Sequence, residues 1–213
     1  MSTVTDPAAQ PPAKLARMRS EDRRELILAA ATEVFGDYGY VGATTAQVAR
    51  AAGVSQPYVV RMFGTKEKLF LEVLLRALGL LLTSFRATLA EESDEPLSRR
   101  LGLAYVDLLQ DRGLLLSLMH GFVLGSDPAI GETARCGFLE VYTFLREEAG
   151  YSADESQAFL ASGMLVNTMI GIRMSDEYDS NPVAAELLTA AFPERLELAL
   201  GSGVVDAPTA PQK

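Results

Sequence analysis

Residues 44–68, TTAQVARAAGVSQPYVVRMFGTKEK, contain two short helical patterns that meet at a glycine turn. Thr44 and Gln47 have the spacing of a capping box, in which each side chain bonds to the backbone of the other residue. Gly53 ends the first helix, because glycine enters the left-handed conformation at little steric cost. Pro57 stands in the first turn of the second helix, where its missing N–H breaks no intrahelical bond. The stretch predicts a helix-turn-helix, whose second helix enters the DNA major groove.

The rest of the chain also has the apolar spacing of helices, without strand-like alternation. Residues 1–18 and 202–213 lack this spacing and predict a disordered basic arm and a loose tail. Pro193 predicts a break after Phe192, because proline lacks the N–H of an intrahelical bond. These patterns predict an all-α fold, with further helices over about residues 20–39, 66–91, 96–110, 114–124, 128–148, 152–176 and 182–200.

Charge is distributed unevenly along the chain. The net charge is −9, which alone would argue against binding to nucleic acid. Residues 14–66, however, carry eight basic and five acidic residues, whereas residues 67–213 have a net charge of −11. A basic N-terminal part on an acidic body indicates one DNA-facing end.

The residue content argues against several kinds of site. The chain has one histidine and one cysteine. A single cysteine can form neither an intrachain disulfide nor a cysteine-based metal cluster, and it fits a reducing cytoplasm. A nucleophile–base–acid constellation and a glycine-rich phosphate loop are absent from the sequence. We therefore expect no enzyme activity, no cofactor and no metal. Every apolar stretch ends before the roughly 20 residues that span a bilayer, so we expect no membrane association.

In its N-terminal third, roughly residues 23–76, the sequence resembles the TetR family of transcriptional regulators. Many positions of the family pattern are matched in the same order, which makes the resemblance specific. The matching residues are Ala30, Ala31, Phe35, Gly39, Tyr40, Thr44, Thr45, Val48, Ala49, Ala52, Gly53, Val54, Ser55, Phe63, Lys66, Glu67, Leu69 and Phe70.

The resemblance implies a two-domain organisation. Residues 19–66 are expected to form the helix-turn-helix DNA-binding domain, and residues 67–201 a helical ligand-binding and dimerisation domain. The family further implies a homodimer formed mainly by the helices over 152–176 and 182–200. A two-fold dimer of this kind binds a palindromic operator in double-stranded DNA.

Seven residues correspond to family positions that meet DNA. In the second helix, Gln56 has the donor and acceptor that fit adenine, and Arg61 has the two donors that fit guanine. Lys66 and the two threonines stand at helix N-termini, where N–H groups attract phosphate. The predicted DNA-binding residues are Thr44, Thr45, Gln56, Pro57, Tyr58, Arg61 and Lys66.

Two positions depart from the family pattern. The family often has tyrosine where this chain has Val60, and histidine or tyrosine where it has Met62. Those side chains commonly reach phosphate in the family. We expect Tyr58, two residues before Val60, to take over part of this contact.

The C-terminal half offers candidates for a ligand pocket. Methionine and flat aromatic side chains suit varied apolar ligands, and Asn167 interrupts an apolar helix face as either a pocket or an interface group. The family implies that a small, largely hydrophobic effector bound there releases the protein, a repressor, from DNA. The candidate pocket residues are Met119, His120, Phe122, Phe138, Tyr142, Met164 and Asn167.

The long helix over 66–91 joins the two halves and is expected to act as the lever between them. Two other functions stay open. A closed C-terminal core would favour a DNA-binding regulator that needs no ligand. A C-terminal cavity that assembles catalytic groups would favour an enzyme.

Overall fold

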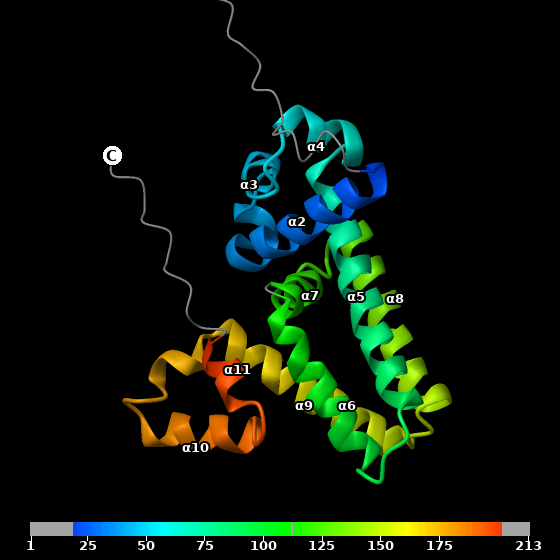
Figure 1. Cartoon of the computed structure of the whole chain (residues 1–213), viewed down its shortest axis with the longest axis vertical. Helices are drawn as coiled ribbons and strands as arrows, with labels where there is room; N and C mark the ends of the chain where they lie inside the picture. Colours follow the sequence, from blue (N-terminus) through cyan, green and yellow to red (C-terminus); the bar gives the residue numbers. More distant parts are fainter. Residues whose placement is uncertain (1–18, 112, 202–213) are drawn as a thin grey trace, which may run out of the picture.

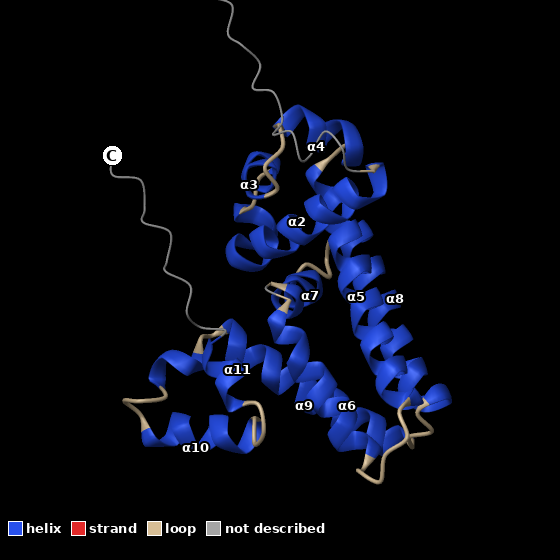
Figure 2. Ribbon diagram, in the orientation of Figure 1, coloured by secondary structure: helices blue, strands red, loops and turns tan. Residues whose placement is uncertain are grey.

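The computed structural model describes residues 19–111 and 113–201, and all regular secondary structure in these ranges is helical (Figures 1 and 2). The prediction of an all-α fold is confirmed. The predicted arm (1–18) and tail (202–213) lie outside the described residues. The first four helices, labelled as in Figure 1, are α2 (Ser20–Gly42), α3 (Thr45–Ala51), α4 (Gln56–Phe63) and α5 (Lys66–Ala90).

The C-terminal helices follow the predicted order, with some differences in where they end. The helix predicted over 152–176 ends at Gly171, because Arg173 adopts a left-handed backbone with a φ of 55°. The break predicted at Pro193 is confirmed, since Phe192 ends α10. The elements are α6 (Leu97–Asp107), the 3₁₀ turn η1 (Leu108–Gln110), α7 (Leu114–Val123), α8 (Pro128–Thr143), the π-helical turn η2 (Phe144–Glu148), α9 (Ala153–Gly171), the 3₁₀ turn η3 (Met174–Glu177), α10 (Pro182–Ala191) and α11 (Leu196–Gly201).

Side-chain caps fix several helix starts. The Thr44 N–H donates to the Gln47 side chain at 2.8 Å, and the Gln47 N–H donates to Thr44 Oγ1 at 3.2 Å. Ser152 and Glu155 form the same reciprocal pair at the start of α9. These bonds satisfy N–H groups that have no partner inside the helix, so the local sequence decides where α3 and α9 begin.

The N-terminal helices α2, α3 and α4 form one end of the molecule (Figure 1). From there α5 runs toward the opposite end, packed along α8. At that opposite end α6 packs on α9, while α7 contacts α2, α5, α8 and α9. Thus α7 lies between the N-terminal helices and the C-terminal bundle.

A single apolar cluster joins the N-terminal helices to the helices that follow. It includes the buried residues Phe35 of α2, Val48 of α3, Phe70 of α5 and Ile130 of α8. The Phe35 and Phe70 rings pack with their centres 4.8 Å apart. Because α5 and α8 share this core with α2 and α3, the N-terminal end is packed directly on the C-terminal part.

Within the described ranges, no individual helix has both the length and the hydropathy of a membrane span. The pair Leu114–Val123 and Pro128–Glu148 meets both criteria when taken together, but it is bent by 120° at its break.

Candidate nucleic-acid interface and effector cavity

Helices α3 and α4 form a tight helix-turn-helix. Gly53 between them has a φ of 66°, which glycine adopts without a side-chain clash. The Val54 N–H donates to the Ala49 carbonyl at 2.9 Å and closes the turn. On α4, Val59 and Phe63 are buried against the core. The opposite face of α4 is therefore turned to solvent.

The solvent face of α4 carries the residues predicted to read DNA. Gln56, Pro57 and Arg61 are exposed, and Tyr58 is half-buried. The guanidinium carbon of Arg61 lies 4.9 Å from the centre of the Tyr58 ring, and that of Arg23 of α2 lies 5.9 Å from it. A cation is attracted to the face of an aromatic ring. Tyr58 thus holds two positive groups at this surface.

The side chain of Gln56 bonds back to α3. Its amide nitrogen donates to Thr45 Oγ1 at 3.1 Å. Thr45 is half-buried, and Thr44 is the exposed N-cap of α3. Six of the seven predicted DNA-binding residues therefore lie on two adjoining helices, at the start of α3 and along α4.

Lys66, the seventh, does not point away from the protein as a phosphate contact requires. Its ammonium donates to the carbonyls of Tyr40 at 2.8 Å, Ala43 at 3.2 Å and Val41 at 3.4 Å, and it lies 4.6 Å from the centre of the Tyr40 ring. These carbonyls follow Gly39, whose φ of 65° interrupts α2 and its hydrogen bonding. In this structure Lys66 therefore links the start of α5 to the segment between α2 and α3, and its contact with phosphate stays a prediction.

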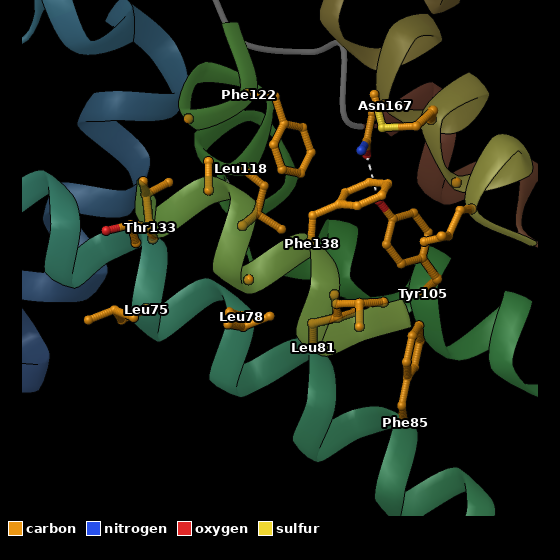
Figure 3. A pocket seen from close by; sticks show the side chains of 18 of the residues that line it. Leu75, Leu78, Leu81, Phe85, Tyr105, Leu118, Phe122, Thr133, Phe138 and Asn167 are labelled. Atoms are coloured by element: carbon orange, nitrogen blue, oxygen red, sulfur yellow. Dashed lines mark hydrogen bonds between the residues drawn. The ribbon is translucent and has the colours of Figure 1, made fainter. Parts of the chain in front are cut away.

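A narrow cavity lies among α5, α6, α7, α8 and α9 (Figure 3). Its volume is about 70 Å³. Four of the seven predicted pocket residues line it, namely Phe122, Phe138, Met164 and Asn167. The rest of the lining is mostly leucine, phenylalanine and glycine. The five helices thus enclose an apolar space.

The other three predicted pocket residues, Met119, His120 and Tyr142, do not line this cavity. His120 lies instead against α2, where its Cε1 would be 3.1 Å from a Cβ atom placed on Gly39. Helix α7 is apolar over most of its surface. Its sequence therefore does not distinguish the face that meets α2 from the face that meets the cavity.

At one end of the cavity, the hydroxyl of Tyr105 donates to Oδ1 of Asn167 at 2.8 Å (Figure 3). Burial raises the pKa of Tyr105 to about 12, and the bond to Asn167 opposes part of that rise. Tyr105 is not among the residues predicted from the sequence. The available signal was the hydroxyl itself, because a tyrosine buried on an apolar helix face needs a hydrogen-bond partner.

Helices α2 and α7 touch through glycine backbone. A Cβ atom placed on Gly36 would lie 2.5 Å from Cα of Gly113, so no side chain fits between these two glycines. Nearby, the Ser117 hydroxyl donates to the Thr32 carbonyl at 3.2 Å. Leu118, the next residue of α7, lines the cavity. Helix α7 therefore contacts α2 with one face and the cavity with another.

Comparison with known proteins identifies the N-terminal part. Residues 27–73 match the family described as bacterial regulatory proteins, tetR family. The HTH-type transcriptional activator FasR of Mycolicibacterium smegmatis is 38% identical over 78 residues, which make up 37% of this chain and 36% of FasR. The match thus spans about a third of the length of that relative.

Solved structures share the fold over most of the chain. A TetR transcriptional regulator from Chloroflexus aurantiacus superimposes with a TM-score of 0.57 at 19% identity, covering 86% of this chain and 92% of that chain. The multidrug binding protein EbrR, in complex with imidazole, superimposes with a TM-score of 0.51 at 21% identity, covering 88% of this chain and 92% of that chain. The family match includes the helix-turn-helix, and the solved structures share the fold of most of the chain. Residues 27–73 therefore match the tetR family of bacterial regulatory proteins, and the chain shares the fold of a solved TetR transcriptional regulator.

Proposed function

We propose that the protein is a homodimeric repressor that is released from a palindromic operator by a small, largely hydrophobic effector. We assign DNA binding to residues 19–66, and effector binding and dimerisation to residues 67–201. The observation that carries the proposal is the position of α7, which contacts α2 with one face and the cavity with another. A repressor needs access to the chromosome, so we place the protein in the cytoplasm.

In the proposed complex, the exposed face of α4 enters the major groove. Arg61 donates to O6 and N7 of a guanine, and Gln56 pairs with an adenine. The Tyr58 ring restrains the Arg61 guanidinium before DNA binds. Less side-chain entropy is therefore lost when Arg61 contacts the guanine. Pro57 offers an apolar contact to a thymine methyl group. The N-terminus of α3, capped by Thr44, faces a phosphate through its free N–H groups.

Helices α9 and α10 form the proposed dimer interface. Leu165 and Ile172 of the α9 region and Val183 and Leu187 of α10 are large apolar side chains that are exposed in the single chain. Among the described elements, α10 packs chiefly on η3 and α11, and Figure 1 shows it set apart from α5 and α8. A second copy would cover these side chains. Its two-fold axis would present two α4 helices to inverted half-sites.

The proposed release begins at the cavity. An effector that widens the cavity displaces Leu118 and the rest of α7, and α2 must follow because Gly36 allows no gap between the two helices. Arg76 of α5 also couples these elements, because it bonds to Glu25 of α2 at 2.6 Å and to Asp111, just before α7, at 3.2 Å. The effector must bind the DNA-incompetent state more tightly, since equal affinity for both states shifts nothing.

Two comparisons bear on this proposal. EbrR, which shares the fold, is a multidrug binding protein, and this supports the use of the same fold for small ligands here. FasR is an activator, but its similarity covers 37% of this chain, so its direction of regulation is not carried over. Repression is the usual action in the family and is the direction that we propose.

Selection from random DNA duplexes with the full chain tests the DNA-binding part. The expected product is an inverted repeat whose half-sites are about one helical turn, or a multiple of it, apart. Arg61→Ala should lose one specified base pair, whereas Arg135→Ala, an exposed residue of α8, should select the same sequence. Enrichment of no sequence at all would contradict the proposal.

Deleting the gene should then raise transcription from the bound promoter, and a fall would instead identify an activator.

The size of the cavity favours a second candidate, a regulator that needs no ligand. Pockets for drug-sized ligands have volumes of about 300–1,000 Å³, whereas this cavity has about 70 Å³. A screen of hydrophobic compounds separates the two candidates. Compounds that raise the melting temperature and release the operator in a gel shift support effector control. A library that changes neither quantity supports ligand-independent binding.

A further inference from the structure

We infer that the effector is an uncharged, narrow apolar molecule with one hydrogen-bond acceptor, such as a ketone or ester oxygen, which the side-chain amide of Asn167 recognises. This inference rests on the proposed function, because it specifies the kind of molecule that the same cavity takes. Three properties of the cavity support it: its shape, its lack of charge and the hydrogen bonding of its polar groups.

The lining of the cavity extends along α5. Its wall on α5 is formed by Leu74, Leu78, Leu81 and Phe85, which follow one side of the helix. These residues span 11 positions, or roughly 16 Å at the rise of an α-helix. Across from them, a Cβ atom placed on Gly137 of α8 would lie only 3.2 Å from the Leu78 side chain. A volume of about 70 Å³ spread along this wall fits a chain-like molecule better than a globular one.

Charge is absent from the cavity wall. None of the described residues that line it is Asp, Glu, Lys, Arg or His. An ionised group inside would lose its hydration without gaining a counter-charge, which is strongly unfavourable. The wall therefore selects against carboxylates and ammonium groups in the part of the ligand that is enclosed.

The polar groups of the wall leave one donor uncommitted. The Thr133 hydroxyl donates to the Ala129 carbonyl at 3.0 Å, and the Tyr105 hydroxyl donates to Oδ1 of Asn167 at 2.8 Å. Asn167 is only 3% exposed, and its amide nitrogen has no acceptor among the described residues. A donor that an apolar ligand shields from water without offering an acceptor is costly. An acceptor oxygen on the effector would remove that cost and fix the orientation of the molecule.

Isothermal titration calorimetry on the full-length protein tests the chemical class with three probes of equal chain length. We expect 2-decanone to bind, and decanoate and decylammonium to bind at least tenfold more weakly, because both carry a charge. Equal or tighter binding of either ion overturns the inference. Failure of all three probes to bind also overturns it, because the cavity then does not take an apolar chain.

Two variants and an isosteric probe test the role of Asn167. The alkene 2-methyl-1-decene has the shape of 2-decanone without the acceptor oxygen, so it should bind roughly threefold to tenfold more weakly. Tyr105→Phe leaves the amide nitrogen of Asn167 in place and should keep this preference for the ketone. The double variant Tyr105→Phe, Asn167→Leu replaces both partners by apolar groups and should abolish the preference. Retention of the preference in the double variant overturns the assignment to Asn167.

The same preparations separate failure of this inference from failure of the proposed function. A gel shift with the selected operator measures DNA binding and release independently of calorimetry. If 2-decanone binds as expected but does not release the operator, effector control fails while the ligand class stands. If a charged probe binds and releases the operator, the ligand class fails while effector control stands.

Discussion

The ammonium group of Lys66 lies 2.8 Å from the carbonyl oxygen of Tyr40, and through this bond the first residue of α5 is tied to the last turn of α2. The same group donates to two further carbonyls, so its hydrogen-bonding capacity is directed into the protein. This contact changes what is expected of Lys66, since a phosphate-binding lysine would leave its donors free.

Replacing Lys66 should therefore affect stability more than salt dependence. Lys66→Met removes charged hydrogen bonds to backbone carbonyls, and we expect it to lower the free energy of unfolding by roughly 1–3 kcal/mol. Urea denaturation measures this loss. Lys68→Met, at an exposed site in the same helix turn, is the matched control and should change stability little. A Lys66→Met protein of unchanged stability, whose DNA affinity depends less steeply on salt, would return Lys66 to the phosphate-binding role.

Arg61 should contribute to sequence specificity. We expect Arg61→Ala to weaken operator binding by roughly 1–3 kcal/mol and to relax specificity at one base pair, because a bidentate contact to guanine is lost. Competition gel shifts with single-base operator variants measure both effects. Tyr58→Leu, which removes the ring beside Arg61, should weaken binding to a smaller extent. Equal losses of affinity at every base pair would show that Arg61 contacts only the backbone of the DNA.

The contact between α2 and α7 should not tolerate a side chain. Gly113 has a φ of 80°, and a Cβ atom on it would lie 2.5 Å from the Thr32 carbonyl oxygen. Gly113→Ala should therefore destabilise the fold by about 2 kcal/mol or more, from backbone strain and overpacking. Gly79→Ala is the control, since nothing lies within 4 Å of its Cβ position in the middle of α5. That variant should stabilise the fold by about 0.5–1 kcal/mol. Thermal unfolding of both variants tests the contrast.

Alkaline pH should weaken the fold through Tyr105. Its pKa is raised to about 12 by burial, from an ordinary value of about 10. The neutral phenol is thus favoured in the folded state, so its contribution to stability is complete below about pH 10 and is lost as pH rises toward 12. The loss is on the order of 2–3 kcal/mol. Unfolding measured from pH 9 to 12 should show this decline, and Tyr105→Phe should flatten it. Some slope should remain from Tyr40 and Tyr151, whose pKa values burial also raises. An unchanged slope in Tyr105→Phe would contradict the assignment.

Features encoded by a few neighbouring residues were predictable from the sequence. The capping box of Thr44 and Gln47 and the left-handed turn at Gly53 depend on backbone only a few positions away. The break before Pro193 follows from the same kind of local rule. The N-terminal helices and the exposed face of α4 were therefore located correctly.

Features that depend on distant packing were not predictable. The position of the Lys66 ammonium depends on the interruption of α2 at Gly39, which frees carbonyls 26 residues earlier in the chain. The apolar sequence of α7 does not show which of its sides meets the cavity, and His120 faces α2. The bond between Tyr105 and Asn167 joins residues 62 positions apart. No local pattern specifies such a pair.

The bare glycine contact between Gly36 and Gly113 has a mechanical consequence. Side chains between packed helices usually absorb small displacements by changing rotamer, so one helix can shift slightly without moving the other. No side chain separates the two glycines at this point, so under the proposed release a brief widening of the cavity by thermal motion would be transmitted through α2 toward α4. The background activity of the regulated promoter, in the absence of any inducer, would then be set by how often the cavity opens by itself. Substitutions deep in the cavity wall, far from any base pair, would then raise or lower transcription from the promoter in the absence of inducer.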